Sequence, residues 1–126
     1  MQQNNDIPKR PVFLADNNLS FVQSFLHYLN GGSSGVRTFS NAGELIGALS
    51  NQPSLLIING QFDNGAGFDI AVSFRERYSD LTIVILLDTD SEELQKKSIR
   101  VAPLCSLIMP VDFRDLKDII LKSGGL

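Results

Sequence analysis

Residues 53–70 read PSLLIINGQFDNGAGFDI. In this stretch an apolar run from Leu55 to Ile58 stops at Asn59 and leads directly into a glycine-rich turn. The pattern predicts a buried strand that ends in a functional site, because ligands and chemistry in open parallel sheets gather just beyond the carboxyl ends of the strands. The first candidate for function is therefore the side-chain amide of Asn59.

Other apolar runs on both sides of this strand alternate with segments whose apolar residues recur at helical spacing. Strands are predicted near residues 12–15, 36–39, 54–58, 81–87 and 104–108. Helices are predicted near residues 19–29, 42–49, 67–78 and 91–100, with a last one opening at Asp112. Five strands alternating with five helices imply parallel pairing, right-handed crossovers and helices on both faces of the sheet. The sequence thus predicts an α/β protein with a doubly wound, five-stranded parallel sheet.

The size of the chain predicts a single domain. Its 126 residues, 43% of them hydrophobic, suffice for one buried core and are too few for two ordinary domains. We expect a flexible leader at residues 1–11, the folded domain at residues 12–123, and the start of a linker or tail at residues 124–126.

Charge and hydropathy exclude several classes of function. The formal net charge of -3 gives no general attraction to nucleic acid or to anionic lipid, so direct nucleic-acid binding is not expected. No stretch approaches the roughly 18 apolar residues of a membrane span, and the first residues lack the apolar core of a signal peptide. The single cysteine, Cys105, cannot form an internal disulfide. Together these features predict a cytoplasmic protein that does not associate with a membrane.

Two motifs extend the pattern around Asn59. Gly67-Phe68-Asp69-Ile70 opens the helix after the glycine-rich turn, and Met109-Pro110-Val111-Asp112-Phe113 leads into the last helix. With these motifs the chain resembles the CheY-like receiver domain of bacterial two-component response regulators. The resemblance covers roughly residues 12–122 and implies a flavodoxin-like sheet with the strand order 2-1-3-4-5.

The resemblance also implies a phosphorylation site, and this chain departs from the family's pattern at most of its positions. The family needs an acidic pair after strand one, an acceptor aspartate after strand three, a hydroxyl after strand four, and an aromatic residue and a lysine in and after strand five. In this chain the acidic pair corresponds to Ala15 and Asp16, and the acceptor corresponds to Asn59. The hydroxyl position corresponds to Leu86, the aromatic position to Ser106 and the lysine position to Met109. Only Asp16 and the proline that follows the lysine position, Pro110, keep the family's residue type.

This degenerate phosphorylation site predicts that the domain is not an enzyme and needs no cofactor. The amide of Asn59 cannot form an acyl phosphate. Asp16 is the one remaining carboxylate of the pair, and a single carboxylate makes a poor Mg²⁺ site, so we expect it to cap a helix, with cation binding as the alternative. Asp63, Asp88 and Asp90 are expected to rim the same end of the sheet and to face solvent or cap helices, with a ligand-binding role as the alternative.

A second candidate site is a surface for protein partners. Helix 91–100, strand 104–108 and the last helix form the usual dimer or partner face in the receiver family. Basic residues on the first helix have acidic counterparts on the second: Lys96, Lys97 and Arg100 against Asp112, Asp115 and Asp118. These charges predict an interaction face, with two solvated helix surfaces as the alternative.

The sequence therefore predicts an atypical receiver domain in bacterial signal transduction. It would act by binding a protein partner or by forming a homodimer, independently of aspartyl phosphorylation, with an output domain downstream in the full-length protein. The alternative function is a small-molecule sensor that holds its ligand in the vacated pocket between Asp16, Asn59, Asp88 and Met109.

Overall fold

A computed structural model of the chain describes residues 10–29 and 35–123. Most of the predicted leader and the predicted tail at 124–126 lie outside the described residues. The strands are β1 (Val12–Ala15), β2 (Val36–Phe39), β3 (Leu55–Asn59), β4 (Thr82–Leu87) and β5 (Cys105–Ile108). The helices are α1 (Leu19–Leu29), α2 (Ala42–Gly47), α3 (Phe62–Gly65), α4 (Gly67–Arg77), α5 (Glu92–Ile99) and α6 (Phe113–Lys122), with a 3-10 turn η2 (Leu49–Asn51).

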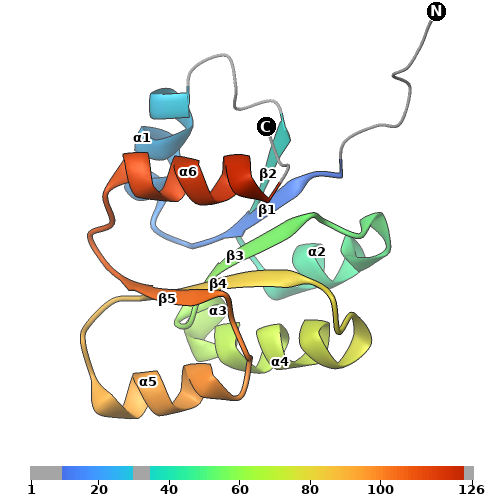
Figure 1. Ribbon diagram of the computed structural model, residues 1–126. Coiled ribbons are helices and arrows are strands. Elements are labelled where there is room, and N and C mark those ends of the chain that lie inside the picture. The colour runs from blue at the N-terminus through green and yellow to red at the C-terminus, as the bar shows by residue number, and fades with distance from the viewer. Residues whose placement is uncertain (1–9, 30–34, 124–126) are drawn as a thin grey trace, which may run out of the picture.

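The five strands form one parallel sheet in the order β2-β1-β3-β4-β5, which confirms the predicted α/β fold and its topology. Helices α1 and α6 cover one face of the sheet, and α2, α4 and α5 cover the other (Figure 1). In the register of the sheet Ala15 pairs with Ile58 and Asn59 pairs with Leu86. The central strand β3 therefore ends between the ends of β1 and β4. None of the helices in residues 10–29 and 35–123 is long and apolar enough to cross a bilayer.

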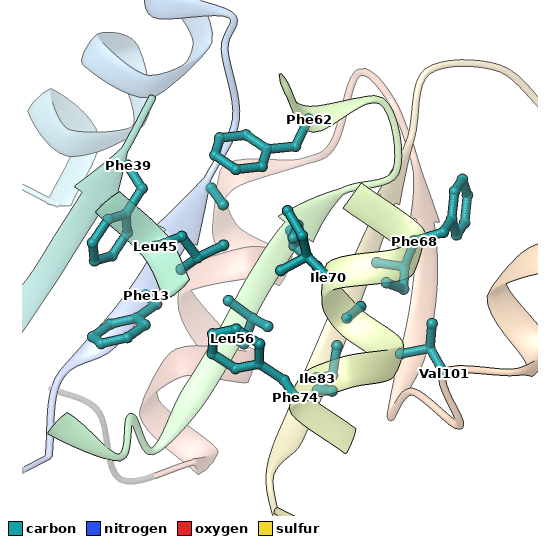
Figure 2. Close-up of a cluster of buried hydrophobic side chains, with 14 of the residues drawn as sticks. Phe13, Phe39, Leu45, Leu56, Phe62, Phe68, Ile70, Phe74, Ile83 and Val101 are labelled. Atoms are coloured by element: carbon teal, nitrogen blue, oxygen red, sulfur yellow. The ribbon is translucent and has the colours of Figure 1, made fainter. Parts of the chain in front are cut away.

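Alternate residues of the strands build two separate cores, because successive side chains of a strand point to opposite faces. Phe13, Leu56 and Ile83 pack below the sheet with Phe74 of α4, in the cluster that Figure 2 shows. The alternate strand residues, such as Val12 and Leu55, pack above the sheet against α1 and α6. Phe25, Leu116 and Ile120 of these helices are buried there. Burial on both faces explains why β3 and β4 are continuously apolar in the sequence.

Side-chain caps start the helices where the sequence predicts. The Asn41 side chain accepts a hydrogen bond from the Glu44 backbone N–H at the start of α2, and Ser91 and Asp112 cap α5 and α6 in the same way. Ile99, an apolar residue at the end of α5, does not pack inward and is 72% exposed. Leu94 is thus the main apolar contact of α5 with the core.

The glycines of the turn allow β3 and α4 to approach very closely. A Cβ atom added at Gly67 would lie 2.1 Å from the Asn59 carbonyl oxygen, well inside van der Waals contact. A Cβ atom at Gly60 would lie 2.4 Å from the ring of Phe68. Only glycine fits at Gly67, and this close packing fixes the end of β3, where Asn59 lies, against the first turn of α4.

Candidate functional site

The ends of β1, β3 and β4 meet at Asn59, whose side chain is buried with 4% exposure. Its amide nitrogen Nδ2 donates two hydrogen bonds, one to Asp16 Oδ2 at 3.2 Å and one to Asp88 Oδ1 at 2.8 Å. An amide nitrogen carries two N–H donors, so both are used. A neutral side chain thus joins two carboxylates that follow two different strands.

The oxygen of the Asn59 amide is also bonded. Oδ1 accepts a hydrogen bond from the Gln61 backbone N–H at 2.8 Å. The next residue is held too, because the Gly60 backbone N–H donates to the Leu86 carbonyl oxygen at 2.9 Å. The side chain is therefore fixed in one orientation by partners on three segments.

Asp16 is the buried carboxylate of the group, with 6% exposure. Burial raises the pKa of the Asp16 carboxyl above its usual value, and the negative charge of Asp88 acts in the same direction. Hydrogen bonds from the Asn18 backbone N–H, at 2.8 Å, and from the Asn59 amide oppose this rise in the pKa. These two hydrogen bonds stabilise the charged form of the Asp16 carboxylate in its buried position.

The helix cap expected from Asp16 comes from another residue. Asn18 Oδ1 accepts a hydrogen bond from the Phe21 backbone N–H at 3.1 Å, directly before α1. Asp16 lies two residues earlier and bonds Asn18 itself, so the prediction that Asp16 caps the helix is wrong.

A hollow of about 240 Å³ opens above Asn59. Its lining includes Asp16, Asp88, Asn17 and Gln61, and none of the described lining residues is basic. The lining is rich in hydrogen-bond acceptors and therefore does not suit an anion such as a phosphoryl group.

The same residues do not fit a bound Mg²⁺. A magnesium ion requires oxygen ligands in near-octahedral geometry. Here Asn59 places an N–H donor group between the two carboxylates and uses one oxygen of each. Within residues 10–29 and 35–123, no three Asp, Glu, His or Cys side chains gather into a metal site.

Two residues assigned to the phosphorylation site lie in the core instead. Ala15 is fully buried in the cluster below the sheet, and Leu86 is fully buried in the cluster above it. Both still belong to their strands, whose side chains point into the layers of helices. The residues that reach the hollow are the first ones beyond the strands, Asp16 and Asp88. The sequence analysis missed the contact of Asp88 with Asn59.

The predicted site residues in and directly after β5, Ser106 and Met109, have other surroundings. Met109 is half-buried against the core under α1 and α6, and its backbone N–H donates to the Leu87 carbonyl oxygen at 2.8 Å. The Met109–Pro110 peptide bond is cis. Ser106 is half-buried on the strand itself. Neither Met109 nor Ser106 belongs to the described lining of the hollow.

The other acidic residues of this rim differ in role. Asp63 Oδ2 accepts a hydrogen bond from the Ala42 backbone N–H at 2.6 Å, so Asp63 stabilises the start of α2, as expected for a loop acid. Asp90 is exposed. The sequence analysis missed Asn17, whose Oδ1 accepts a hydrogen bond from the Asp63 backbone N–H at 2.7 Å.

The charged residues of the predicted interaction face pair within their own helices. Three ion pairs occur in the described part of the chain: Lys96 with Glu92 at 3.5 Å, Asp112 with Arg114 at 3.2 Å, and Asp118 with Lys122 at 2.9 Å. The side-chain hydrogen bond from Arg114 lowers the pKa of Asp112. Lys97, Arg100 and Asp115 form no ion pair with a described residue. These exposed charges are thus available to a partner at little cost.

Comparison with known proteins relates the chain to one group of solved structures. No protein-family model and no curated protein sequence matches it. A CheY-like response regulator receiver domain protein from Methanospirillum hungatei superposes with a TM-score of 0.79 at 17% identity, over 93% of this chain and 95% of that chain. A response regulator receiver protein from Pseudomonas putida gives 0.77 at 21% identity, over 92% and 99%.

The same fold also matches part of a larger protein. NtrX from Brucella abortus, solved in complex with ADP, superposes with a TM-score of 0.75 at 14% identity, over 92% of this chain and 26% of that chain. The chain therefore has the fold of CheY-like response regulator receiver domains, a fold that also occurs within longer chains.

Proposed function

We propose that this chain, which has the fold of a response regulator receiver domain, takes part in signal transduction by binding other proteins, without aspartyl phosphorylation. The observation that carries the proposal is the position of the Asn59 amide between Asp16 and Asp88. In the resemblance to the receiver family, Asn59 occupies the acceptor position. A neutral amide there offers no carboxylate oxygen to attack a phosphoryl group.

The surroundings of Asn59 support the same proposal. Phosphoryl transfer depends on cations that neutralise the charge of the transferred group. Among the residues that the structure describes, no basic side chain lines the hollow, and Met109 stands where the family has its lysine. Both N–H donors of the amide already join the two carboxylates, so the Asn59 side chain has its hydrogen-bond partners without a phosphoryl group or a metal ion.

Incubation with acetyl phosphate and Mg²⁺ tests the proposal. We expect no phosphoryl adduct by intact-mass measurement, and no Mg²⁺-dependent beryllofluoride shifts in the amide spectrum at Asp16, Asn59 or Asp88. A receiver domain that retains its acceptor aspartate serves as the control and should gain the adduct under the same conditions. A stable adduct on this chain would contradict the proposal.

We propose further that the partner surface is centred on β5. This strand is an edge of the sheet, and edge strands leave unpaired backbone groups. Exposed apolar side chains surround it: Ile99 is 72%, Leu104 is 63% and Ile108 is 38% exposed. Apolar side chains gathered around an edge strand favour contact with a protein, either a second copy of the chain or another partner.

The oligomeric state tests the dimer form of this proposal. We expect a concentration-dependent dimer in sedimentation experiments, and we expect Leu104→Glu to weaken it by about tenfold or more, since a charge would be buried in an apolar contact. Leu19→Glu is the matched control, because Leu19 is 65% exposed on α1 and lies outside this surface. A monomer at millimolar concentration would contradict the dimer, and an equal effect of both variants would contradict its location.

The small-molecule sensor has less support. The hollow above Asn59, at about 240 Å³, is smaller than the roughly 300–1,000 Å³ of typical ligand sites. Met109, which was expected to line it, does not. A ligand would also compete with hydrogen bonds that Asn59 already makes to Asp16 and Asp88.

The proposal also includes the protein to which this domain belongs. The match to a quarter of NtrX supports an arrangement in which this domain is joined to an output domain in a longer cytoplasmic protein.

A further inference from the structure

A second hollow lies at the amino end of the sheet, away from Asn59. Its volume is about 310 Å³, and its lining includes residues that directly precede β3 and β4, such as Ser54 and Leu81. Since parallel strands all run the same way, this is the end opposite to the one where Asn59 lies. Buried Pro53 and Leu81 form apolar parts of the lining.

Two arginines line this hollow: Arg10, before β1, and Arg77, the last residue of α4. Neither forms an ion pair with a described residue. The Arg77 guanidinium lies 5.9 Å from the centroid of the Tyr78 ring. Two arginines at one hollow, neither ion-paired with a carboxylate in the described part of the chain, form a local excess of positive charge on a chain that is acidic overall.

Hydrogen bonds to neighbouring residues hold two segments that line the hollow. Arg75 Nη1 donates to the Ser79 carbonyl oxygen at 2.8 Å, which holds the loop between α4 and β4. On the other side, the Ser54 backbone N–H donates to the Pro11 carbonyl oxygen at 2.9 Å. The hollow therefore exists before any ligand arrives, which lowers the entropic cost of binding.

One carboxylate opposes the positive charge. Asp80 belongs to the lining, but it forms no ion pair with any described residue. Its exposed position means that solvent screens much of its repulsion toward an anion. With two arginines and one solvent-screened carboxylate, the net charge of the lining is positive and favours an anionic ligand.

We propose that this hollow binds a small organic phosphate. Guanidinium forks match phosphate oxygens in bidentate geometry. The hydroxyl group of Ser79 adds a neutral donor, and the apolar lining suits a short carbon skeleton. The volume falls at the lower end of the roughly 300–1,000 Å³ of typical ligand sites, so the ligand is small. This site is independent of the function proposed for Asn59 and for the surface around β5.

An amide-resolved NMR titration at constant ionic strength tests the site, with inorganic phosphate and ribose 5-phosphate as the probes and chloride as the reference anion. We expect saturable shifts confined to residues 10, 52–54 and 77–81. Arg77→Gln should weaken binding by about tenfold or more, since a charged hydrogen-bond donor is lost. Asp80→Asn should tighten binding several-fold, because it removes the repulsion.

Two further variants make the outcome decisive. Arg100→Gln removes the same charge from an exposed position outside the hollow and should leave affinity unchanged. Arg10→Gln should repeat the loss seen for Arg77→Gln without altering a helix. Shifts that do not saturate, shifts centred on Asn59, or an equal loss in Arg100→Gln would each overturn the proposal.

Discussion

Replacing Asn59 by aspartate is expected to lower the free energy of unfolding by about 3 kcal/mol at neutral pH without divalent cations. The change removes the amide donor that joins Asp16 to Asp88 and puts a third carboxylate next to them. Losing one partner of a buried charged group costs roughly 3–5 kcal/mol. Asp88 is exposed, and solvent around it keeps the cost at the lower end of that range. Urea unfolding followed by circular dichroism measures the change.

The penalty of Asn59→Asp should depend on pH in a defined direction. Burial already raises the pKa of Asp16 in the folded state, and a third acid nearby would raise carboxyl pKa values further. A folded state with raised carboxyl pKa values binds protons more tightly than the unfolded state, so its stability falls as pH rises through those values. The variant should therefore lose less stability near pH 4 than at pH 7.

Magnesium should affect the stability of Asn59→Asp and of the natural chain differently. Three carboxylates offer the oxygen ligands that Mg²⁺ prefers, so the ion is expected to raise the melting temperature of Asn59→Asp and not that of the natural chain. Asn51→Asp makes the same chemical change at an exposed residue of η2 and serves as the control. Equal stability of Asn59→Asp and Asn51→Asp would contradict the role given to the Asn59 amide.

Gly67→Ala is expected to destabilise the fold by about 3 kcal/mol, at the upper end of the range for overpacking. The new Cβ atom would meet the carbonyl oxygens of Asn59 and Gly60 at 2.1 and 2.8 Å. Both are backbone atoms, so no side-chain rotation relieves the clash, and either α4 or the end of β3 must move. The midpoint of urea unfolding measures the loss.

A second glycine provides the matched control for Gly67→Ala. At Gly47, the last residue of α2, an added Cβ atom has no atom within 4 Å. Gly47→Ala should leave the stability unchanged or raise it by up to about 1 kcal/mol, because alanine loses less conformational entropy in a helix. If Gly67→Ala were as harmless as Gly47→Ala, the close approach of β3 and α4 would be contradicted.

The fold was predictable because one physical signal repeats through the chain. Continuous apolar runs such as Leu55 to Ile58 occur when both faces of a parallel strand are covered. Helical spacing and capping side chains such as Asn41 then fix the alternation of strands and helices. The exposure of Ile99 was not predictable, because the spacing of apolar residues does not reveal whether a neighbouring element covers the end of a helix.

The position of Asn59 in the site was predictable from the sequence, and the residues around it were less predictable. Asn59 closes β3, and its position followed from the apolar run alone. Ala15 and Leu86 do not reach the hollow: Ala15 is the last residue of β1, one position before Asp16, and Leu86 lies within β4, two positions before Asp88. The end of each strand decides which residue reaches the hollow, and tertiary hydrogen bonds such as that from the Gly60 backbone N–H to the Leu86 carbonyl oxygen help to set that end. A signal for Asp88 was present, since it is the first polar residue after the run of β4.

The hydrogen bonds of Asn59 and Gly60 also bear on how this protein ages. An asparagine followed by glycine is the dipeptide most open to spontaneous deamidation, in which the glycine nitrogen attacks the side-chain amide carbon. Here the Gly60 N–H is bonded to Leu86, and the Asn59 amide is held by Asp16, Asp88 and Gln61. The attack would require several of these bonds to break at once. The folded chain thus protects its own Asn59 from conversion to an acid, and the unfolded chain does not.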